Sequence, residues 1–245
     1  MIIVYTCIAG SYDTLIKQPQ FEDVTYVCFS DSIAPGIHKR WEVRSIDNPT
    51  TDKPNLLNRF YKIFPFKFFS KNEYSLYIDG NIRLKVHPRN LLDQFKKSQK
   101  SMAVFRHPNR KYLKDELEAC INQGKLHGEQ IYQAESFLSA IKQEGFSSPV
   151  ELVAGYILLR RHDDNKLNDA MKDWFKIVSN QVPRDQLSLV YALWKNNNDL
   201  AYLDDWIEPE KFFDRLHHGF FIPIMPLYIQ NFFKKMLTKI KALKN

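Results

Sequence analysis

Asp79-Gly80-Asn81 places two oxygen-bearing side chains directly after an apolar run over residues 74–78. The glycine between them lets both side chains reach one hard divalent cation that also holds a diphosphate. Open α/β sheets bind their ligands at the carboxyl ends of the strands. The pattern therefore predicts a nucleotide-sugar site at this turn. Taken alone, Asp-Gly-Asn is also an ordinary hairpin turn, with residues 82–84 as the returning strand.

A helix predicted over residues 55–64 precedes this strand. Asn55, Arg59 and Lys62 stand at i, i+4 and i+7 and share one face, opposite an apolar stripe. Such a face can hold phosphates, and a solvated face of an amphipathic helix is the alternative. The position of the helix just before the Asp79 strand favours phosphate binding.

Short apolar runs alternate along the chain with segments whose apolar residues recur at helical spacing. Strands are predicted over residues 2–7, 24–29, 74–78, 102–105 and 152–159, and helices over residues 55–64, 113–121, 167–178 and 187–194. The strand runs are continuously apolar, which is typical of strands buried on both faces. The order predicts an α/β sheet flanked by helices, in one domain over residues 1–225.

The amino-acid composition limits the classes of partner that this protein is expected to bind. Lys and Arg outnumber Asp and Glu by 35 to 28, and the net charge of +7 suits a polyanionic ligand, an acidic membrane or nucleic acid. Nucleic-acid motifs are not visible and much of the excess charge lies near the carboxyl end, so we expect no nucleic-acid partner. The three cysteines lack CxxC spacing, which favours a reducing cytosol. The apolar N-terminal run lacks a basic flank, so we expect a strand there rather than a signal peptide.

Residues 226–245 differ in composition from the rest of the chain. Apolar side chains recur there at helical spacing, and the polar face carries Lys234, Lys235, Lys239, Lys241 and Lys244. The pattern predicts an amphipathic tail helix on an anionic membrane surface, where each Lys contributes about 1 kcal/mol. Packing onto the domain or onto a partner chain is the alternative. We therefore expect a cytoplasmic protein that is peripheral on the inner face of the membrane.

Several short motifs, in this order, resemble a glycosyltransferase-like family long catalogued as domain of unknown function 616. The motifs are Tyr-Thr-Cys-Ile-Ala-Gly-Ser-Tyr-Asp at 5–13, Cys-Phe-Ser-Asp at 28–31, Asn-Arg-Phe-Tyr-Lys at 58–62, Tyr-Ile-Asp-Gly-Asn at 77–81, Phe-Arg-His-Pro-Asn-Arg at 105–110 and Arg-Asp-Gln at 184–186. The resemblance extends from the first strand to about Pro223. It implies a GT-A-like (Rossmann-like) mixed sheet, a nucleotide-sugar donor with a UDP-sugar favoured, and Mn²⁺ or Mg²⁺.

The resemblance also implies donor and metal residues. The donor-binding candidates are Ala9, Gly10, Asp13, Asp31, Asn55, Arg59, Lys62 and Asp79. Turn chemistry is the alternative for Asp13 and Asp31. The metal candidates are Asp79 and Asn81, completed by His217 or His218. Since the amide of Asn81 supplies an oxygen without charge, we expect weak metal binding in the absence of the diphosphate.

Catalytic and acceptor-side residues follow from the later motifs. Asp185 is the first catalytic candidate, as a base or as a brace for the reacting sugar, and N-capping of a helix is its alternative. Glu151 is the second, and His107 could transfer a proton or bind a sugar hydroxyl. The acceptor-side candidates are Arg106, Arg110, Gly155 and Gln186.

The motifs together predict a metal-dependent hexosyl- or related transferase. We expect transfer from a nucleotide-diphosphate sugar to a glycan or lipid-linked acceptor, in cell-surface polysaccharide synthesis. The alternative is a catalytically inactive, membrane-associated scaffold of the same fold, because Asn81 weakens the metal site.

Overall fold

The central sheet of this protein is built from continuously apolar segments, and its inner strands are shielded from water on both faces. In β1 (Ile2–Ile8) every residue is buried, as expected for a strand covered on both sides. The computed structural model describes residues 1–47, 51–69, 74–147 and 151–217. The predicted boundary at 225/226 and the predicted tail helix lie outside these residues.

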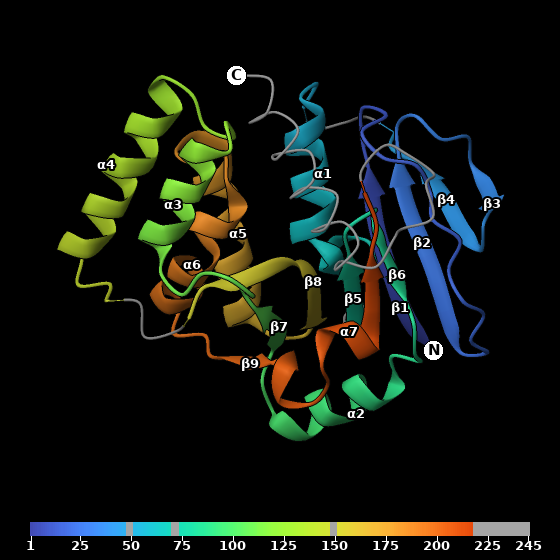
Figure 1. Ribbon diagram of the computed structural model, residues 1–245. Coiled ribbons are helices and arrows are strands. Elements are labelled where there is room, and N and C mark those ends of the chain that lie inside the picture. The colour runs from blue at the N-terminus through green and yellow to red at the C-terminus, as the bar shows by residue number, and fades with distance from the viewer. Residues whose placement is uncertain (48–50, 70–73, 148–150, 218–245) are drawn as a thin grey trace, which may run out of the picture.

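The main sheet has eight strands in the order β3-β4-β2-β1-β5-β8-β7-β9 (Figure 1). Besides β1, its strands are β2 (Val24–Ser30), β3 (Gly36–His38), β4 (Trp41–Ser45), β5 (Tyr74–Ile78), β7 (Met102–Arg106), β8 (Val153–Arg161) and β9 (Leu200–Tyr202). The four strands β4, β2, β1 and β5 are mutually parallel, and β8 runs antiparallel between β5 and β7. The sheet is therefore mixed, as predicted.

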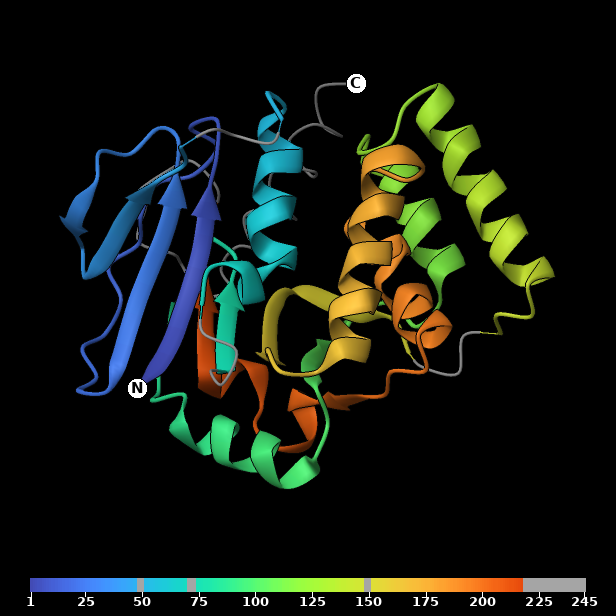
Figure 2. The same ribbon diagram turned by 180° about the vertical axis from the view of Figure 1, so that it is seen from behind.

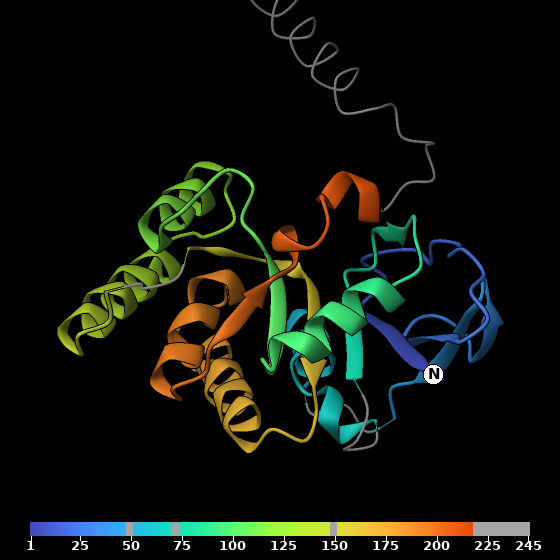
Figure 3. The ribbon, with the colours of Figure 1, turned by 90° about the horizontal axis from the view of Figure 1, so that it is seen from below.

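Two groups of helices cover the two faces of the sheet. The long helices α1 (Pro54–Ile63) and α5 (Asn165–Asn180) lie together on one face (Figure 2). On the same side, α6 (Leu189–Lys195) packs against α5, and α3 (Leu113–Asn122) packs against the outermost helix α4 (Glu129–Gln143). The other face is covered by α2 (Arg89–Ser98) and α7 (Pro209–Phe212), and Figure 3 shows α7 on the side opposite to α1 and α5.

Three short helical turns and one strand pair complete the described chain. The turns are η1 (Pro65–Lys67), η2 (Asp185–Leu187) and η3 (Leu203–Asp205). Strand β6 (Ile82–Leu84) pairs antiparallel with β10 (Phe213–Arg215). The hairpin alternative for the Asp-Gly-Asn turn is therefore wrong, because the strand after the turn pairs with β10 and not with β5.

The predicted strands and helices are confirmed, with one division. The helix predicted over residues 187–194 is split between η2 and α6, since Ser188 lies between them in a non-helical conformation. The buried cysteines Cys7, Cys28 and Cys120 carry free thiols. Among the described helices, none is both long and apolar enough to cross a membrane.

Candidate functional site

Strand direction brings the predicted site residues to one edge of the sheet. Strands β1, β2 and β5 are parallel, and β7 runs in the same direction because β8 is antiparallel to both β5 and β7. Their carboxyl ends are followed by Gly10, Asp31, Asp79 and His107. The amino end of β8, with Gly155, lies at the same edge. This is the edge at which open α/β sheets bind ligands.

Asp185 is the centre of a buried ion-pair network at this edge. Its carboxylate accepts a hydrogen bond from Lys62 Nζ at 2.7 Å, and Arg59 Nε lies 3.3 Å from the same oxygen. Lys62 Nζ is in turn 3.9 Å from Asp79 Oδ1. Asp79, Lys62, Asp185 and Arg59 thus form a row of alternating charge that joins β5, α1 and η2.

Burial and charge act in opposite directions on Asp185. The side chain is 5% exposed, and burial alone would raise its pKa. The charges of Arg59 and Lys62 outweigh burial and hold the pKa of Asp185 well below its ordinary value. Asp185 is therefore ionised at neutral pH, and it is a weak base. Arg184 is the N-cap residue of η2 and no side chain caps this turn, so the capping alternative for Asp185 is wrong.

Tyr77, which lies on the same face of the strand as Asp79, also contributes to this network. Tyr77 donates a hydrogen bond from its hydroxyl to Asp79 Oδ1 at 3.0 Å. Burial, together with the charge of Asp79, raises the pKa of Tyr77 well above its ordinary value, so the phenol keeps its proton. Asp79 itself remains partly open, with 28% of its side chain exposed.

Lys62 is buried, and this corrects the expectation of an open cationic stripe on α1. Only 3% of Lys62 is exposed, whereas Asn55 at the start of the helix is exposed. The end of α1 is held by Arg160 of β8, which donates hydrogen bonds to Lys62 O at 2.6 Å and Ile63 O at 3.2 Å. Tyr5 also donates to Lys62 O, at 2.9 Å. Two bonds thus hold the Lys62 carbonyl and a third holds that of Ile63, next to the lysine whose ammonium reaches Asp185.

Gly155, a predicted acceptor-side residue, lies close to the ion-pair residues. A Cβ built on Gly155 would lie 3.3 Å from Lys62 Nζ, 3.7 Å from Asp185 Oδ2 and 3.8 Å from Gln186 Cγ. The register between β7 and β8 also shifts at this part of β8. A larger residue would therefore press on the Lys62 ammonium.

The loop after β1 is held by structural contacts. Asp31 accepts hydrogen bonds from Gly10 N at 2.9 and 3.1 Å. Gly10 has φ +63°, and a Cβ there would lie 2.6 Å from Pro54 Cβ, so this glycine permits contact with the start of α1. Asp13 lies against the Asp-Gly-Asn turn, since a Cβ on Gly80 would be 3.2 Å from Asp13 Oδ2. Asp31 thus has the turn-stabilising contact named as its alternative, and Ala9, which precedes Gly10, is buried.

A divalent cation at the Asp-Gly-Asn turn fits if a substrate supplies part of its shell. Asn81 is 3% exposed, and its Nδ2 donates to Leu216 O at 2.7 Å, which ties the turn to the residue before His217. Across the described ranges there is no group of three or more His, Cys, Asp or Glu side chains arranged to hold a metal. Asp79 is 28% exposed and His217, which follows Leu216, is exposed, and Asn81 uses its Nδ2 for the bond to Leu216. His218 lies outside the described residues.

Two of the predicted acceptor-side residues, Arg106 and Arg110, form two further clusters, whereas Gly155 and Gln186 lie beside Asp185. Arg106 donates to Asp205 Oδ1 at 2.8 Å, and its Nε lies 3.6 Å from Glu151 Oε2. Its guanidinium also lies 3.7 Å from the centre of the Tyr202 ring. Glu151, with 46% of its side chain exposed, faces Lys111 as well, at 3.8 Å. Glu151, the second catalytic candidate, therefore balances the charges of Arg106 and Lys111 at the rim. No contact among the described residues places Glu151 beside Asp185.

His107 and Arg110 surround a buried acid of α3. Glu116 is 1% exposed, and Arg110 Nε lies 2.6 Å from its Oε2. The backbone N–H groups of Asn109 and Arg110 donate to His107 Nδ1 at 3.2 and 3.1 Å. Burial lowers the pKa of His107, and the Arg110 charge adds to this effect. His107 is therefore neutral at neutral pH and shapes the loop after β7.

Sequence reasoning missed Tyr77 and Arg184 at this edge, and it also missed Tyr5 and Arg160, which lie further along the sheet and hold the end of α1. Tyr77 stands two residues before Asp79, so strand alternation places both on one face, and this signal could have found it. Arg160 follows the apolar run of the predicted strand directly and stands next to Arg161, so the sequence did not indicate that it would be buried. Arg184 stands next to Asp185 and lines a pocket that begins at α1.

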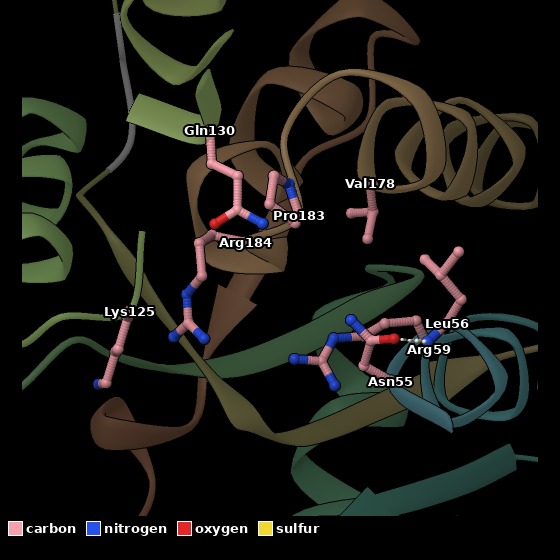
Figure 4. Close-up of a pocket in the computed structure, with 8 residues that line it drawn as sticks. All are labelled: Asn55, Leu56, Arg59, Lys125, Gln130, Val178, Pro183 and Arg184. Atoms are coloured by element: carbon pink, nitrogen blue, oxygen red, sulfur yellow. Dashed lines mark hydrogen bonds between the residues drawn. The ribbon is translucent and has the colours of Figure 1, made fainter. Parts of the chain in front are cut away.

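That pocket is drawn in Figure 4 and has a volume of about 160 Å³. Its lining residues are Asn55, Leu56, Arg59, Lys125, Gln130, Val178, Pro183 and Arg184. They come from α1, the α3–α4 loop, the first turn of α4, the end of α5 and the segment before η2. Nothing in the sequence indicated that these segments meet.

Comparison with known proteins gives one family and one curated relative. A family described as "TOD1/MUCI70, glycosyltransferase-like domain" matches residues 36–204, which is more than half of the chain. "Probable hexosyltransferase MUCI70" of Arabidopsis thaliana is 26% identical over 216 residues, covering 76% of this chain and 36% of that protein. The chain thus spans about a third of the length of this relative.

Solved structures of low sequence identity are similar in part. The bifunctional glycosyltransferase WbbM has a TM-score of 0.48 at 12% identity, over 82% of this chain and 38% of that one. The galactosyltransferase LgtC, solved with donor and acceptor sugar analogues, has a TM-score of 0.45 at 10% identity, over 82% of this chain and 73% of that one. Mouse xyloside xylosyltransferase 1 has a TM-score of 0.43 at 8% identity, over 82% of this chain and 84% of that one.

Proposed function

The chain belongs to the TOD1/MUCI70 family of glycosyltransferase-like domains, and from this premise we propose that it transfers a hexose or related sugar from a nucleotide-diphosphate donor. A UDP-sugar is the favoured donor, and a glycan or a lipid-linked sugar is the acceptor. The observation that carries the proposal is the row formed by Asp79, Lys62, Asp185 and Arg59 at the carboxyl end of β5. Cell-surface polysaccharide synthesis is the pathway we propose.

Fixed positive charge is what the transfer requires from the protein. As the glycosidic bond breaks, negative charge builds on the leaving diphosphate, and preorganised cations lower the free energy of that state. Lys62 and Arg59 can supply this charge without reorganisation, because Asp185 and the bonds to the end of α1 already hold them. The first role of Asp185 is therefore to position the two cations. Its low pKa makes it a poor general base.

A bound Mn²⁺ or Mg²⁺ would neutralise diphosphate charge, and Asp79 with His217 would hold it. Asn81 keeps the segment before His217 against the turn through its bond to Leu216. On the acceptor side, Glu151 and His107 remain our candidates for contacts with the incoming hydroxyl. Arg106, Arg110 and Gln186 border that side.

The first experiment is thermal unfolding of the full chain with UDP, GDP, CMP and their sugar conjugates, each with and without Mn²⁺. A ligand at about 100 times its dissociation constant stabilises the native state by roughly 2.7 kcal/mol, which raises Tm by several degrees at this size. We expect a Mn²⁺-dependent rise for one nucleotide class that is lost in Asp79→Ala. The control is Asp199→Ala, which removes a side chain that is 82% exposed.

Two results would contradict the proposal. One is the absence of a shift with every nucleotide, and the other is an equal shift in the wild type and Asp79→Ala. Nucleotide binding without sugar transfer or donor hydrolysis would favour the inactive scaffold, for which Asn81, in place of a second acid, is the supporting observation. Measured hydrolysis of a nucleotide sugar would exclude that scaffold.

We also propose that the basic segment over residues 226–245 attaches the protein to the cytoplasmic face of a membrane. The support is the sequence pattern, because these residues lie outside the described structure. Sedimentation of the full chain with anionic vesicles, but not with zwitterionic vesicles, is the expected result. A variant with Lys234, Lys235 and Lys239 changed to Gln should stay in the supernatant, and binding unaffected by these changes would contradict the proposal.

A further inference from the structure

We propose that the pocket between α1, the α3–α4 loop and the segment before η2 binds a carboxylate or phosphate group carried by one of the two reacting sugars. This inference rests on the proposed function and adds the chemical class of the substrate. The term anion pocket is used below for the eight lining residues of Figure 4.

The anion pocket carries more positive charge than the acidic side chains around it neutralise. Arg59, Lys125 and Arg184 line it, and no acidic residue is among its described lining residues. Asp185 balances Arg59, but neither Lys125 nor Arg184 forms an ion pair with a residue in the described part of the chain. The Arg184 side chain donates a hydrogen bond to Cys120 and its charge acts on Asp185, but its Nε is buried without a hydrogen-bond partner among the described residues. An anion in the pocket would compensate both the charge and the unused donor.

The side chains are aimed at a common space. In Figure 4 the guanidinium groups of Arg59 and Arg184 extend into the pocket from opposite walls, and Lys125 lies beside Arg184. Guanidinium groups bind carboxylates and phosphates through paired N–H donors, which suits an anion held between the two arginines. The amides of Asn55 and Gln130 add neutral donors and acceptors that suit sugar hydroxyls.

Position separates this pocket from the proposed diphosphate site. Lys62 Nζ lies 3.9 Å from Asp79 and 2.7 Å from Asp185, so it stands between the two carboxylates. Arg59 contacts Asp185 and continues into the anion pocket, whereas Asp79 and Lys62 do not line it. A diphosphate bound at Asp79 therefore leaves the anion pocket to the sugars.

Size also favours a small charged group. A volume of about 160 Å³ equals that of about five water molecules at ≈30 Å³ each. Pockets for drug-sized ligands occupy roughly 300–1,000 Å³. This size suits a carboxylate or phosphate with part of its sugar ring.

The test is calorimetric titration of the full chain with matched neutral and anionic sugars. One arm titrates UDP-glucose and UDP-glucuronic acid and reports on the donor. The other arm adds glucose, glucuronic acid or glucose 6-phosphate to protein saturated with UDP and Mn²⁺ and reports on the acceptor. We expect at least about tenfold tighter binding of an anionic member in one arm, as for a charge-assisted contact of about 1.4 kcal/mol.

A double variant, Lys125→Gln with Arg184→Gln, should lose this preference and retain the wild-type affinity for UDP. The matched control is Lys114→Gln with Lys172→Gln, which removes the same charge from side chains that are 82% and 64% exposed. The control should keep the preference. Unchanged UDP affinity also shows that the pocket variant is folded.

Three results would overturn the inference. The wild type could bind UDP and show no preference for an anionic sugar in either arm. The preference could survive in the pocket variant. The pocket variant could lose UDP affinity by the same factor as sugar affinity, which would assign the pocket to the diphosphate. If no nucleotide bound the wild type, the proposed function would fail first, and the inference with it.

Discussion

Two ion pairs of equal length allow the effect of burial on the Asp185 network to be measured. Lys62 Nζ and Asp185 Oδ2 are 2.7 Å apart with both side chains about 5% exposed or less. Lys172 Nζ and Asp169 Oδ1 are also 2.7 Å apart, with side chains 64% and 59% exposed. Asp185→Asn and Asp169→Asn therefore remove the same charge at the same distance from a lysine, but Asp185 is buried and also contacts Arg59, whereas Asp169 is exposed.

The expected losses of unfolding free energy differ several-fold. Asp185→Asn leaves the Lys62 and Arg59 charges without their counter-ion, and breaking a buried pair in this way costs about 3–5 kcal/mol. Asp169→Asn should change the free energy of unfolding by less than about 1 kcal/mol, because solvent screens the exposed pair. Since Asn keeps the size of Asp, the difference measures charge rather than packing.

The pH dependence has a defined sign. The pKa of Asp185 is lowered in the folded state, so its ionised form stabilises the fold. This contribution is complete above about pH 5, begins to fall near pH 4, the pKa of an unfolded Asp, and is lost progressively as the pH drops towards the lowered pKa of the folded state. Urea unfolding of the wild type and both variants at pH 7, 5 and 3.5 measures it. A loss for Asp185→Asn no larger than that for Asp169→Asn at pH 7 would refute the reasoning.

Two glycine substitutions give further tests. Gly10→Ala should lower Tm by several degrees, because φ is +63° and the new Cβ would lie 2.6 Å from Pro54 Cβ; the backbone strain alone costs roughly 1–2 kcal/mol, and an unchanged Tm would contradict this reading. Gly155→Ala should reduce kcat for sugar transfer more than it reduces Tm, because its Cβ would press on Lys62 Nζ at 3.3 Å. Equal kcat values for Gly155→Ala and the wild type would show that the position of Lys62 is not critical.

Local patterns predicted the sheet and its ligand edge well. The run Tyr74–Ile78 is the strand β5 with the predicted bounds, because a continuous apolar run fits only a strand covered on both faces. The short strand β3 escaped prediction because all three of its residues are exposed. Asp79 was predicted to lie at the ligand-binding edge because it directly follows a predicted strand. This prediction requires only the direction of the strand.

Long-range pairing could not be read in the same way. Lys62 and Asp185 are 123 positions apart, and the helical pattern of α1 gave equal support to a solvated Lys62. Burying an ammonium is favourable only with a partner, and the partner is identified only when η2 is placed beside α1. The anion pocket escaped prediction for the same reason, since its walls come from five segments of the chain.

The pairing of β10 with β6 sets an upper limit on the distance between the sugar-transfer edge and the proposed membrane-attachment segment. Asn81 and Leu216 exchange two hydrogen bonds of 2.7 Å, which hold the chain at the Asp-Gly-Asn turn just before His217. From there to residue 226 the chain has a contour length of about 30 Å at roughly 3.3–3.6 Å per residue. A surface that binds the segment from 226 onward would therefore keep the sugar-transfer edge within about 30 Å of itself. The chain would act as a short tether that limits which acceptors this edge can reach.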